Sequence, residues 1–165
     1  MNLFKRVPRW LLIATIGIVP VVIALVNSLR GGAILVGDRA VFALLVKDAA
    51  TGSFPSVGQY SWHGWNHPGA LIFYVFAPFH WLSGGAAWGL FLGVAVYSCA
   101  LLVAISWLGY RLRGIWGSAL GVAALLAYWV SVGRIASVDA WTPYLALPLF
   151  ILFLLAVLGV TERDR

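Results

Sequence analysis

Four long hydrophobic runs divide the chain, and most polar residues lie between them. The runs cover residues 10–29, 86–109, 115–132 and 143–160, and none of them contains Asp, Glu, Lys, Arg or His. A helix of about twenty apolar residues is long enough to cross the hydrocarbon core of a membrane. The pattern therefore predicts an all-α fold, a polytopic membrane helix bundle with about four transmembrane helices. Residues 1–165 are expected to form a single membrane domain.

A fifth apolar segment, residues 69–83, is too short to cross a membrane comfortably. Pro78 interrupts it, and His80 and Trp81 stand near its end. Aromatic side chains favour the depth of the lipid headgroups. We therefore predict an interfacial or partly re-entrant helix here rather than a fifth span.

Basic residues indicate how the chain is oriented. Lys5, Arg6 and Arg9 precede the first run, and Arg111 and Arg113 separate the second run from the third. Cytoplasmic segments of membrane proteins are enriched in Lys and Arg. Four spans with both termini in the cytoplasm satisfy this rule, whereas a fifth span would place Arg111 and Arg113 outside.

The same topology places residues 30–68 in a large first outer loop and residues 133–142 in a second. A cleaved signal peptide is the competing interpretation of the N-terminus. However, the run at 10–29 is longer than the apolar core of a signal peptide, and no clear cleavage site follows it. We therefore expect an uncleaved signal anchor and a multi-pass protein of the cell membrane, surrounded by the lipid bilayer.

The first outer loop contains a predicted amphipathic helix at 38–51. Asp38 is a good N-cap residue, and Gly52 is a good C-terminal stop. Arg39 and Lys47 lie on the polar side of the helix. The apolar face is formed by Val41, Phe42, Leu45 and Ala49. We expect this helix to lie along the outer membrane surface.

Composition supports a membrane protein and excludes several other classes. Hydrophobic residues make up 62% of the chain and charged residues 10%, against about 45–50% and about 25% in soluble domains. The net charge is +6, but the basic residues are scattered and form no basic face, so nucleic acid is not an expected partner. Cys99 is the only cysteine, which excludes disulfides within the chain and Cys-rich metal sites.

Ionisable side chains gather only at the predicted outer rim. Ion and proton pathways usually contain ionisable residues inside the membrane, so the uncharged runs disfavour half of a transporter. Any chemistry is therefore expected at the rim. The ionisable residues there are Asp38, Arg39, Lys47, Asp48, His63, His67, His80, Arg134 and Asp139.

Two interpretations remain open for most of these residues. Asp38 either caps its helix or acts as a general base that takes a proton from an acceptor hydroxyl. His67 either satisfies backbone groups before Pro68 or belongs to a site. His63 and His67, with one or two carboxylates, are potential ligands of a divalent cation. Their spacing gives no support for this, because it falls in a loop containing Gly and Pro.

The tryptophans also have two interpretations. They form either an aromatic belt at the membrane interface or a set of faces that stack on a sugar ring or a lipid chain. Position in the sequence does not decide between these roles. The residues concerned are Trp62, Trp65, Trp81, Trp88 and Trp141.

Two stretches resemble a known family. GDRAVFALLVKDAATGSFPSVGQYSWHGWNHPGALIFYVFAPFHWLSG (37–84) is similar to the first outer loop of GT-C fold polytopic glycosyltransferases, above all the actinobacterial arabinofuranosyl- and mannosyltransferase-like proteins. DAWTPYLALPLF (139–150) resembles an Asp-Pro-Trp-Asn-Pro-Tyr stretch that opens a later span of these proteins. The chain departs from the pattern at Ala70, Ala140 and Thr142.

The resemblance implies transfer of a sugar from a polyprenyl-phosphate donor to a glycan, lipid or protein acceptor at the outer membrane face. It implies Asp38 as the catalytic base. The residues it implies for substrate binding are Arg39, Tyr60, His63, Trp65, His67, Arg134, Asp139 and Trp141, with Lys47 adding positive charge.

The family fold has about twice as many spans as this chain. The sequence is therefore interpreted as an N-terminal portion or a truncated relative, and a non-catalytic four-span subunit or scaffold is the alternative.

Overall fold

The computed structural model describes residues 7–61, 63–67, 69–133 and 135–161. The described part of the chain is all-helical. Its elements are α1 (Arg9–Arg30), α2 (Asp38–Thr51), α3 (Leu71–Ser83), α4 (Ala87–Val132) and α5 (Thr142–Thr161). Several residues that carry predictions, namely Lys5, Arg6, Trp62, Pro68 and Arg134, lie outside the described residues.

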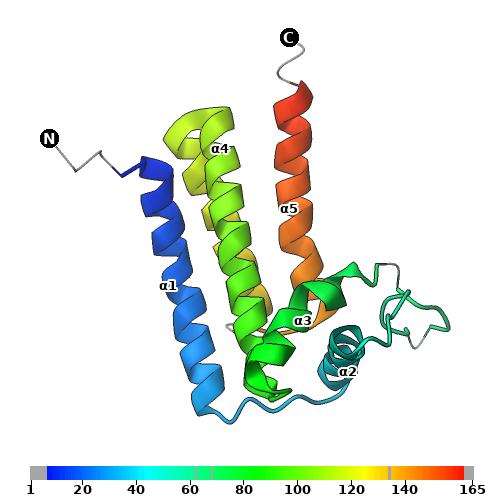
Figure 1. The fold of residues 1–165 in the computed structure, drawn as a ribbon. Coiled ribbons are helices and arrows are strands. Elements are labelled where there is room, and N and C mark those ends of the chain that lie inside the picture. The colour runs from blue at the N-terminus through cyan, green and yellow to red at the C-terminus, as the bar shows by residue number, and fades with distance from the viewer. Residues whose placement is uncertain (1–6, 62, 68, 134, 162–165) are drawn as a thin grey trace, which may run out of the picture.

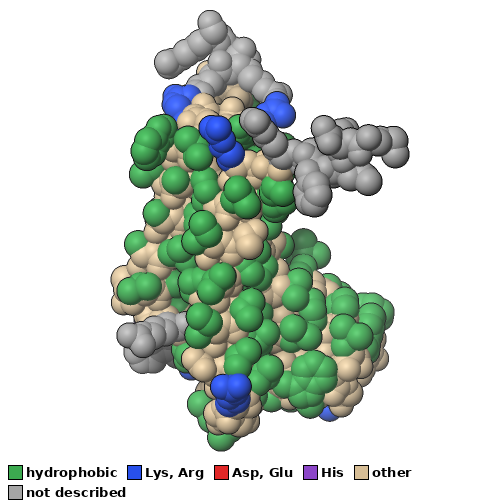
Figure 2. Space-filling view, turned by 90° about the vertical axis from the view of Figure 1, so that its left-hand side faces the viewer, with side chains coloured by type: hydrophobic (Ala, Val, Ile, Leu, Met, Phe, Trp, Pro, Cys, Tyr) green, Lys and Arg blue, Asp and Glu red, His purple; other side chains and the backbone are tan. Residues whose placement is uncertain are grey.

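Three of these helices, α1, α4 and α5, are long and apolar enough to cross a membrane. They run alongside one another, and α2 and α3 lie across one end of the bundle (Figure 1). A space-filling view shows a broad hydrophobic band between ends that carry Lys and Arg (Figure 2). The protein is therefore a helical, multi-pass membrane protein, as predicted.

The longest element, α4, consists of two arms. Its backbone leaves the helical conformation at Arg113 and at Gly114, whose φ is +59° and ψ −148°. Only glycine adopts such a conformation at little cost, so Gly114 permits the reversal that is visible in Figure 1. The arms, residues 87–112 and 115–132, correspond to the second and third hydrophobic runs.

Small residues bring the two arms together beside the reversal. A Cβ atom on Gly109 would lie 2.5 Å from the carbonyl oxygen of Gly117, and one on Gly117 would overlap the carbonyl oxygen of Gly109. Farther along, the hydroxyl groups of Ser106 and Ser118 are 2.6 Å apart, and Ser106 donates to the carbonyl of Trp10 in α1. Because Ser106 has one proton, Ser118 donates to Ser106.

An apolar cluster joins α2 and α3 to the beginning of α4. The ring of Phe42 meets those of Phe73 and Phe76 edge to face, at centroid distances of 5.1 and 5.7 Å. This geometry suits the charge distribution of aromatic rings. The predicted apolar face of α2 is partly wrong, because Val46 is buried there and Val41 is exposed.

The predicted helix at 38–51 is confirmed, and it ends at Gly52 as expected. The role of Asp38 as N-cap is wrong: Gly37 occupies that position, and Asp38 lies in the first turn without a capping hydrogen bond. The second predicted helix begins at Leu71, two residues later than 69.

The connector between α4 and α5 is an outer loop in the prediction, but its residues 136–140 are buried. The hydroxyl of Ser98 in α4 donates to the carbonyl of Ser137, at 2.7 Å. Val138 is fully buried. The chain therefore packs against the first arm of α4 before α5 begins, and this places Asp139 inside the protein.

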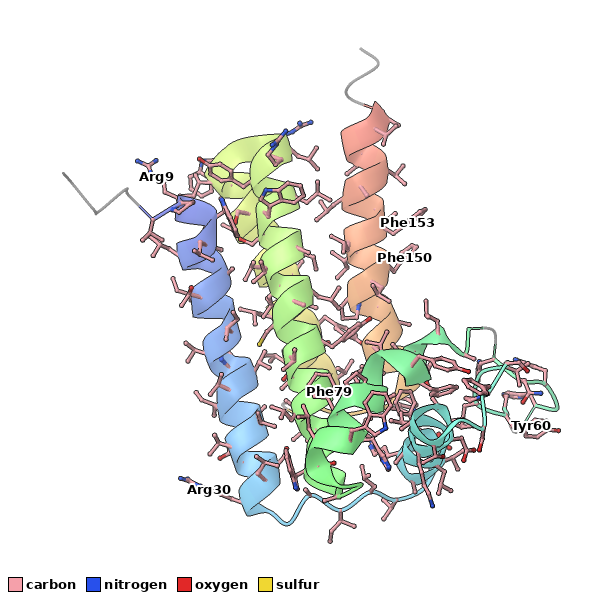
Figure 3. All side chains as sticks on the ribbon, in the orientation of Figure 1. Arg9, Arg30, Tyr60, Phe79, Phe150 and Phe153 are labelled. Atoms are coloured by element: carbon pink, nitrogen blue, oxygen red, sulfur yellow. The ribbon has the colours of Figure 1, made fainter. Side chains whose placement is uncertain are left out.

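Among the described helices, α4 is the one with which α5 makes extensive contacts. Phe150 and Phe153 project from its opposite side (Figure 3) and are 54% and 60% exposed. Such exposure is expected for side chains that face lipid.

Candidate functional site

The segment between α2 and α3 folds into a narrow loop that resembles a hairpin. Gly58 N–H donates to the carbonyl of His67, and His67 N–H donates back to the carbonyl of Gln59. Nearer the tip, Ser61 N–H donates to the carbonyl of Trp65, at 2.7 Å. Since a Cβ at Gly58 would overlap His67, this close pairing requires glycine at that position.

Aromatic rings line this loop. The rings of His63 and Trp65 stack with centroids 5.4 Å apart, and His67 meets Trp65 edge to face at 6.5 Å. Tyr60 lies at the outer edge of the loop (Figure 3) and is 66% exposed. The loop therefore presents flat apolar faces together with imidazole nitrogen atoms, a combination suited to a polar ring-shaped ligand.

A cavity of about 620 Å³ lies between this loop and the beginnings of α2 and α5. The volume is that of a small-molecule site. It is lined by Asp38, Gln59, Tyr60, Ser61, His63, Trp65, His67, Trp141, Thr142 and Pro143. Two helix N-termini, those of α2 and α5, adjoin the cavity, and the positive ends of helix dipoles attract anions.

Asp38 stands at the cavity wall as an exposed carboxylate. Its Oδ2 accepts a hydrogen bond from Nε1 of Trp141, at 3.2 Å. Its backbone carbonyl accepts a hydrogen bond from the side chain of Gln59, at 2.7 Å. Gln59 in turn accepts from Thr142, at 3.3 Å. These contacts fix Asp38 relative to the loop and to α5.

Arg39 and Asp139 form a two-point ion pair beside the cavity. Nε donates to Oδ1 and an Nη donates to Oδ2, both at 2.6 Å. The Asp139 side chain is 3% exposed and that of Arg39 is 34% exposed. The hydrogen bond to Asp139 is the main reason that the pKa of Arg39 rises above its usual value. The pair ties α2 to the segment that precedes α5.

The structure brings most of the predicted site residues together. The residues that share the cavity are Asp38, Tyr60, His63, Trp65, His67 and Trp141. Arg39 and Asp139 lie next to it and are engaged with each other, and Arg134 lies outside the described residues. Lys47 and His80 line a different cavity, of about 300 Å³, which shares no lining residue with the first.

Three polar residues that connect the segments were not predicted from the sequence, namely Gln59, Ser61 and Thr142. Gln59 and Ser61 are 8% and 7% exposed. A buried Gln in a loop of mostly exposed residues has no periodic signal, so only its hydrogen bonds reveal its role. Among the described residues, no group of three His, Cys, Asp or Glu side chains lies close enough to hold a metal ion.

No known family model, curated protein or solved structure matches this chain. The likeness to GT-C glycosyltransferases therefore remains a prediction from the two stretches quoted above.

Proposed function

We propose that this protein is a membrane glycosyltransferase, or part of one, that uses a polyprenyl-phosphate sugar as its donor. The acceptor is a glycan, lipid or protein of the cell envelope, and the reaction takes place at the outer face of the membrane. The cavity at Asp38 is the proposed site.

One observation carries the proposal. A carboxylate, aromatic faces and imidazoles from three distant parts of the sequence, at 38, 59–67 and 141–143, line one cavity. Tyr60, Trp65 and Trp141 offer faces on which a sugar ring stacks. The backbone N–H of Thr142, at the start of α5, and the side chain of His67 offer donors to a phosphate. A carboxylate with one oxygen held by Trp141 is a suitable proton acceptor.

The proposed step is a substitution at the anomeric carbon of the donor. Asp38 accepts the proton of an acceptor hydroxyl while the hydroxyl oxygen forms a bond to that carbon. The bond between the carbon and the phosphate oxygen breaks, and polyprenyl phosphate leaves with the bonding electrons. Asp38 then releases its proton to water.

The proposed topology has four crossings, formed by α1, the two arms of α4, and α5. Both termini lie in the cytoplasm, and α2 and α3 lie at the outer interface. The break at Arg113–Gly114 supports this count, as does the amphipathic surface of α2, where Leu44 is 59% exposed. The cavity then opens at headgroup depth, where a lipid-linked donor is accessible.

Asp38→Asn is the test of the catalytic assignment. Asn keeps an oxygen that accepts the Trp141 hydrogen bond but removes the proton acceptor, so we expect turnover to fall about 10²–10⁴-fold. Membranes containing the full-length protein are assayed with a panel of polyprenyl-phosphate sugars. Asp48→Asn is the matched control, because Asp48 is an acid of the same helix outside the cavity, and its turnover should remain unchanged.

The second candidate function is a non-catalytic membrane subunit or scaffold. It is favoured by the internal use of the polar groups, since Arg39 pairs with Asp139 and Asp38 bonds to Trp141. Normal turnover in Asp38→Asn would withdraw the catalytic role of this carboxylate. Absence of transfer from every donor in the wild-type protein would favour the scaffold.

A further inference from the structure

The two ends of the helix bundle differ strongly in charge. The N-terminus of α1, the reversal in α4 and the C-terminus of α5 meet at one end (Figure 1). The described residues at these points include three arginines (9, 111 and 113) and no Asp or Glu. This end of the described bundle is therefore basic.

A cavity of about 450 Å³ lies at this end, between the first arm of α4 and the last turns of α5. Leu108, Leu112 and Val160 supply apolar walls, and Trp107 and Arg111 supply the polar boundary. Gly159 adds no side chain to the wall, and a Cβ there would be in contact with Leu112, at 3.4 Å. The cavity is thus apolar toward the membrane and basic toward its end.

Arg111 lies over an aromatic ring and has no acidic partner among the described residues. Its guanidinium lies over the ring of Trp107, 5.9 Å from the centroid, and it makes no ion pair with any residue that the structure describes. A guanidinium that stacks on an aromatic face keeps its N–H donors at its edge. Those donors are well suited to a phosphate, which they bind at two points.

We propose that this cavity binds an anionic phospholipid. Arg111 binds the headgroup phosphate, and an acyl chain lies against Leu108, Leu112 and Val160. The site stands where the hydrophobic band meets the basic end, which is the depth of lipid phosphates, and basic pockets between transmembrane helices are suited to anionic headgroups.

The site does not depend on the proposed glycosyltransferase function. It shares no lining residue with the cavity at Asp38. Its occupant neutralises part of the positive charge at this end and fills the space between α4 and α5, so we expect it to stabilise the packing of α5. Helix α5 has few other contacts with the bundle, which makes this effect measurable.

The test compares phosphatidylglycerol with phosphatidylcholine of the same acyl chains, added to the purified full-length protein in detergent. Binding is measured by native mass spectrometry and by the shift in the unfolding temperature. We expect phosphatidylglycerol to bind more tightly, and Arg111→Gln to weaken that binding about fivefold, the effect of one basic residue at a lipid surface.

Two controls separate a site from general attraction to a basic end. Arg9→Gln removes the same charge at the same end outside the cavity and should weaken binding less than Arg111→Gln. Gly159→Leu fills the cavity without changing the charge and should also lower the affinity for phosphatidylglycerol. Equal losses in Arg9→Gln and Arg111→Gln, unchanged binding in Gly159→Leu, or no preference for phosphatidylglycerol in the wild type would overturn the proposal.

Discussion

At the scale of single residues, Arg39 shows how a partner inside the protein changes the role inferred from residue type. Arg39 follows Asp38 in a polar stretch, and the resemblance implies that it binds a donor phosphate. In the structure its guanidinium is engaged by Asp139, one hundred positions away. The sequence identified both residues as belonging to one region, but it gave no sign that they pair with each other, because the pairing depends on the buried path of residues 136–140.

Loss of this ion pair should destabilise the fold. Arg39→Gln leaves the carboxylate of Asp139 buried without its cation. We expect the free energy of unfolding to fall by about 3 kcal/mol, the low end for a broken buried pair, because Arg39 is one-third exposed. Unfolding in detergent, followed by tryptophan fluorescence, measures this loss. Arg30→Gln, at an exposed arginine, should change it by less than about 0.5 kcal/mol.

A double substitution distinguishes pairing from two separate contributions. In Arg39→Gln/Asp139→Asn neither charge remains, so the double variant should be more stable than the sum of the two single losses predicts. Strictly additive losses would mean that the two side chains act independently, and the ion pair would then not explain the position of α2.

At the scale of secondary-structure elements, helix existence was easier to predict than helix orientation. The pattern of α2 correctly gave residues 38–51, because a left-handed stop at Gly52 and a polar start bound an apolar stretch. It failed to say which apolar residues are buried. Val41 and Leu44 are exposed and Val46 is buried, because apolar side chains surround much of this helix and only those facing α3 are covered.

The reversal in α4 was likewise predicted only in part from the sequence. The basic stretch at Arg111–Arg113 separated two hydrophobic runs and so marked a boundary. The contact that holds the arms together, between Gly109 and Gly117, joins residues on either side of that boundary. Nothing in the sequence distinguishes Gly109 and Gly117 among the 18 glycines of the chain, so only the three-dimensional arrangement assigns them this role.

Close packing of the arms predicts an unequal response to the same substitution. Gly109→Ala places a methyl group against the backbone of Gly117, which cannot yield as a side chain does, so we expect a loss of about 1–3 kcal/mol. A methyl group at position 159 would contact Leu112 at 3.4 Å, so Gly159→Ala should be neutral or slightly stabilising. Thermal unfolding in detergent compares the two variants, and equal midpoints would contradict a tight crossing at Gly109.

At the scale of the whole molecule, the membrane makes the helical fold easier to predict than the site. Lipid requires every backbone group to be bonded internally, so long apolar runs become helices almost regardless of their neighbours, and α1, α4 and α5 follow. The cavity at Asp38 instead depends on contacts among three distant segments. Its aromatic residues were predicted from their unusual density, whereas Gln59 and Thr142, which join the segments, were not.

The charge distribution gives the last prediction, which concerns orientation. Arg9, Arg111 and Arg113 share one end of the bundle, and basic ends remain in the cytoplasm. In a Cys99→Ala background, single cysteines are introduced as Leu112→Cys, beside the α4 reversal, and as Ser56→Cys, in the loop between α2 and α3. A membrane-impermeant thiol reagent added to intact cells should label position 56 but not 112, and permeabilised cells should be labelled at both. Labelling at 112 alone in intact cells would mean that the orientation is the opposite of the predicted one. Labelling at both positions in intact cells would place the loop between α2 and α3 and the α4 reversal on the same side, and the four-crossing topology would then be wrong.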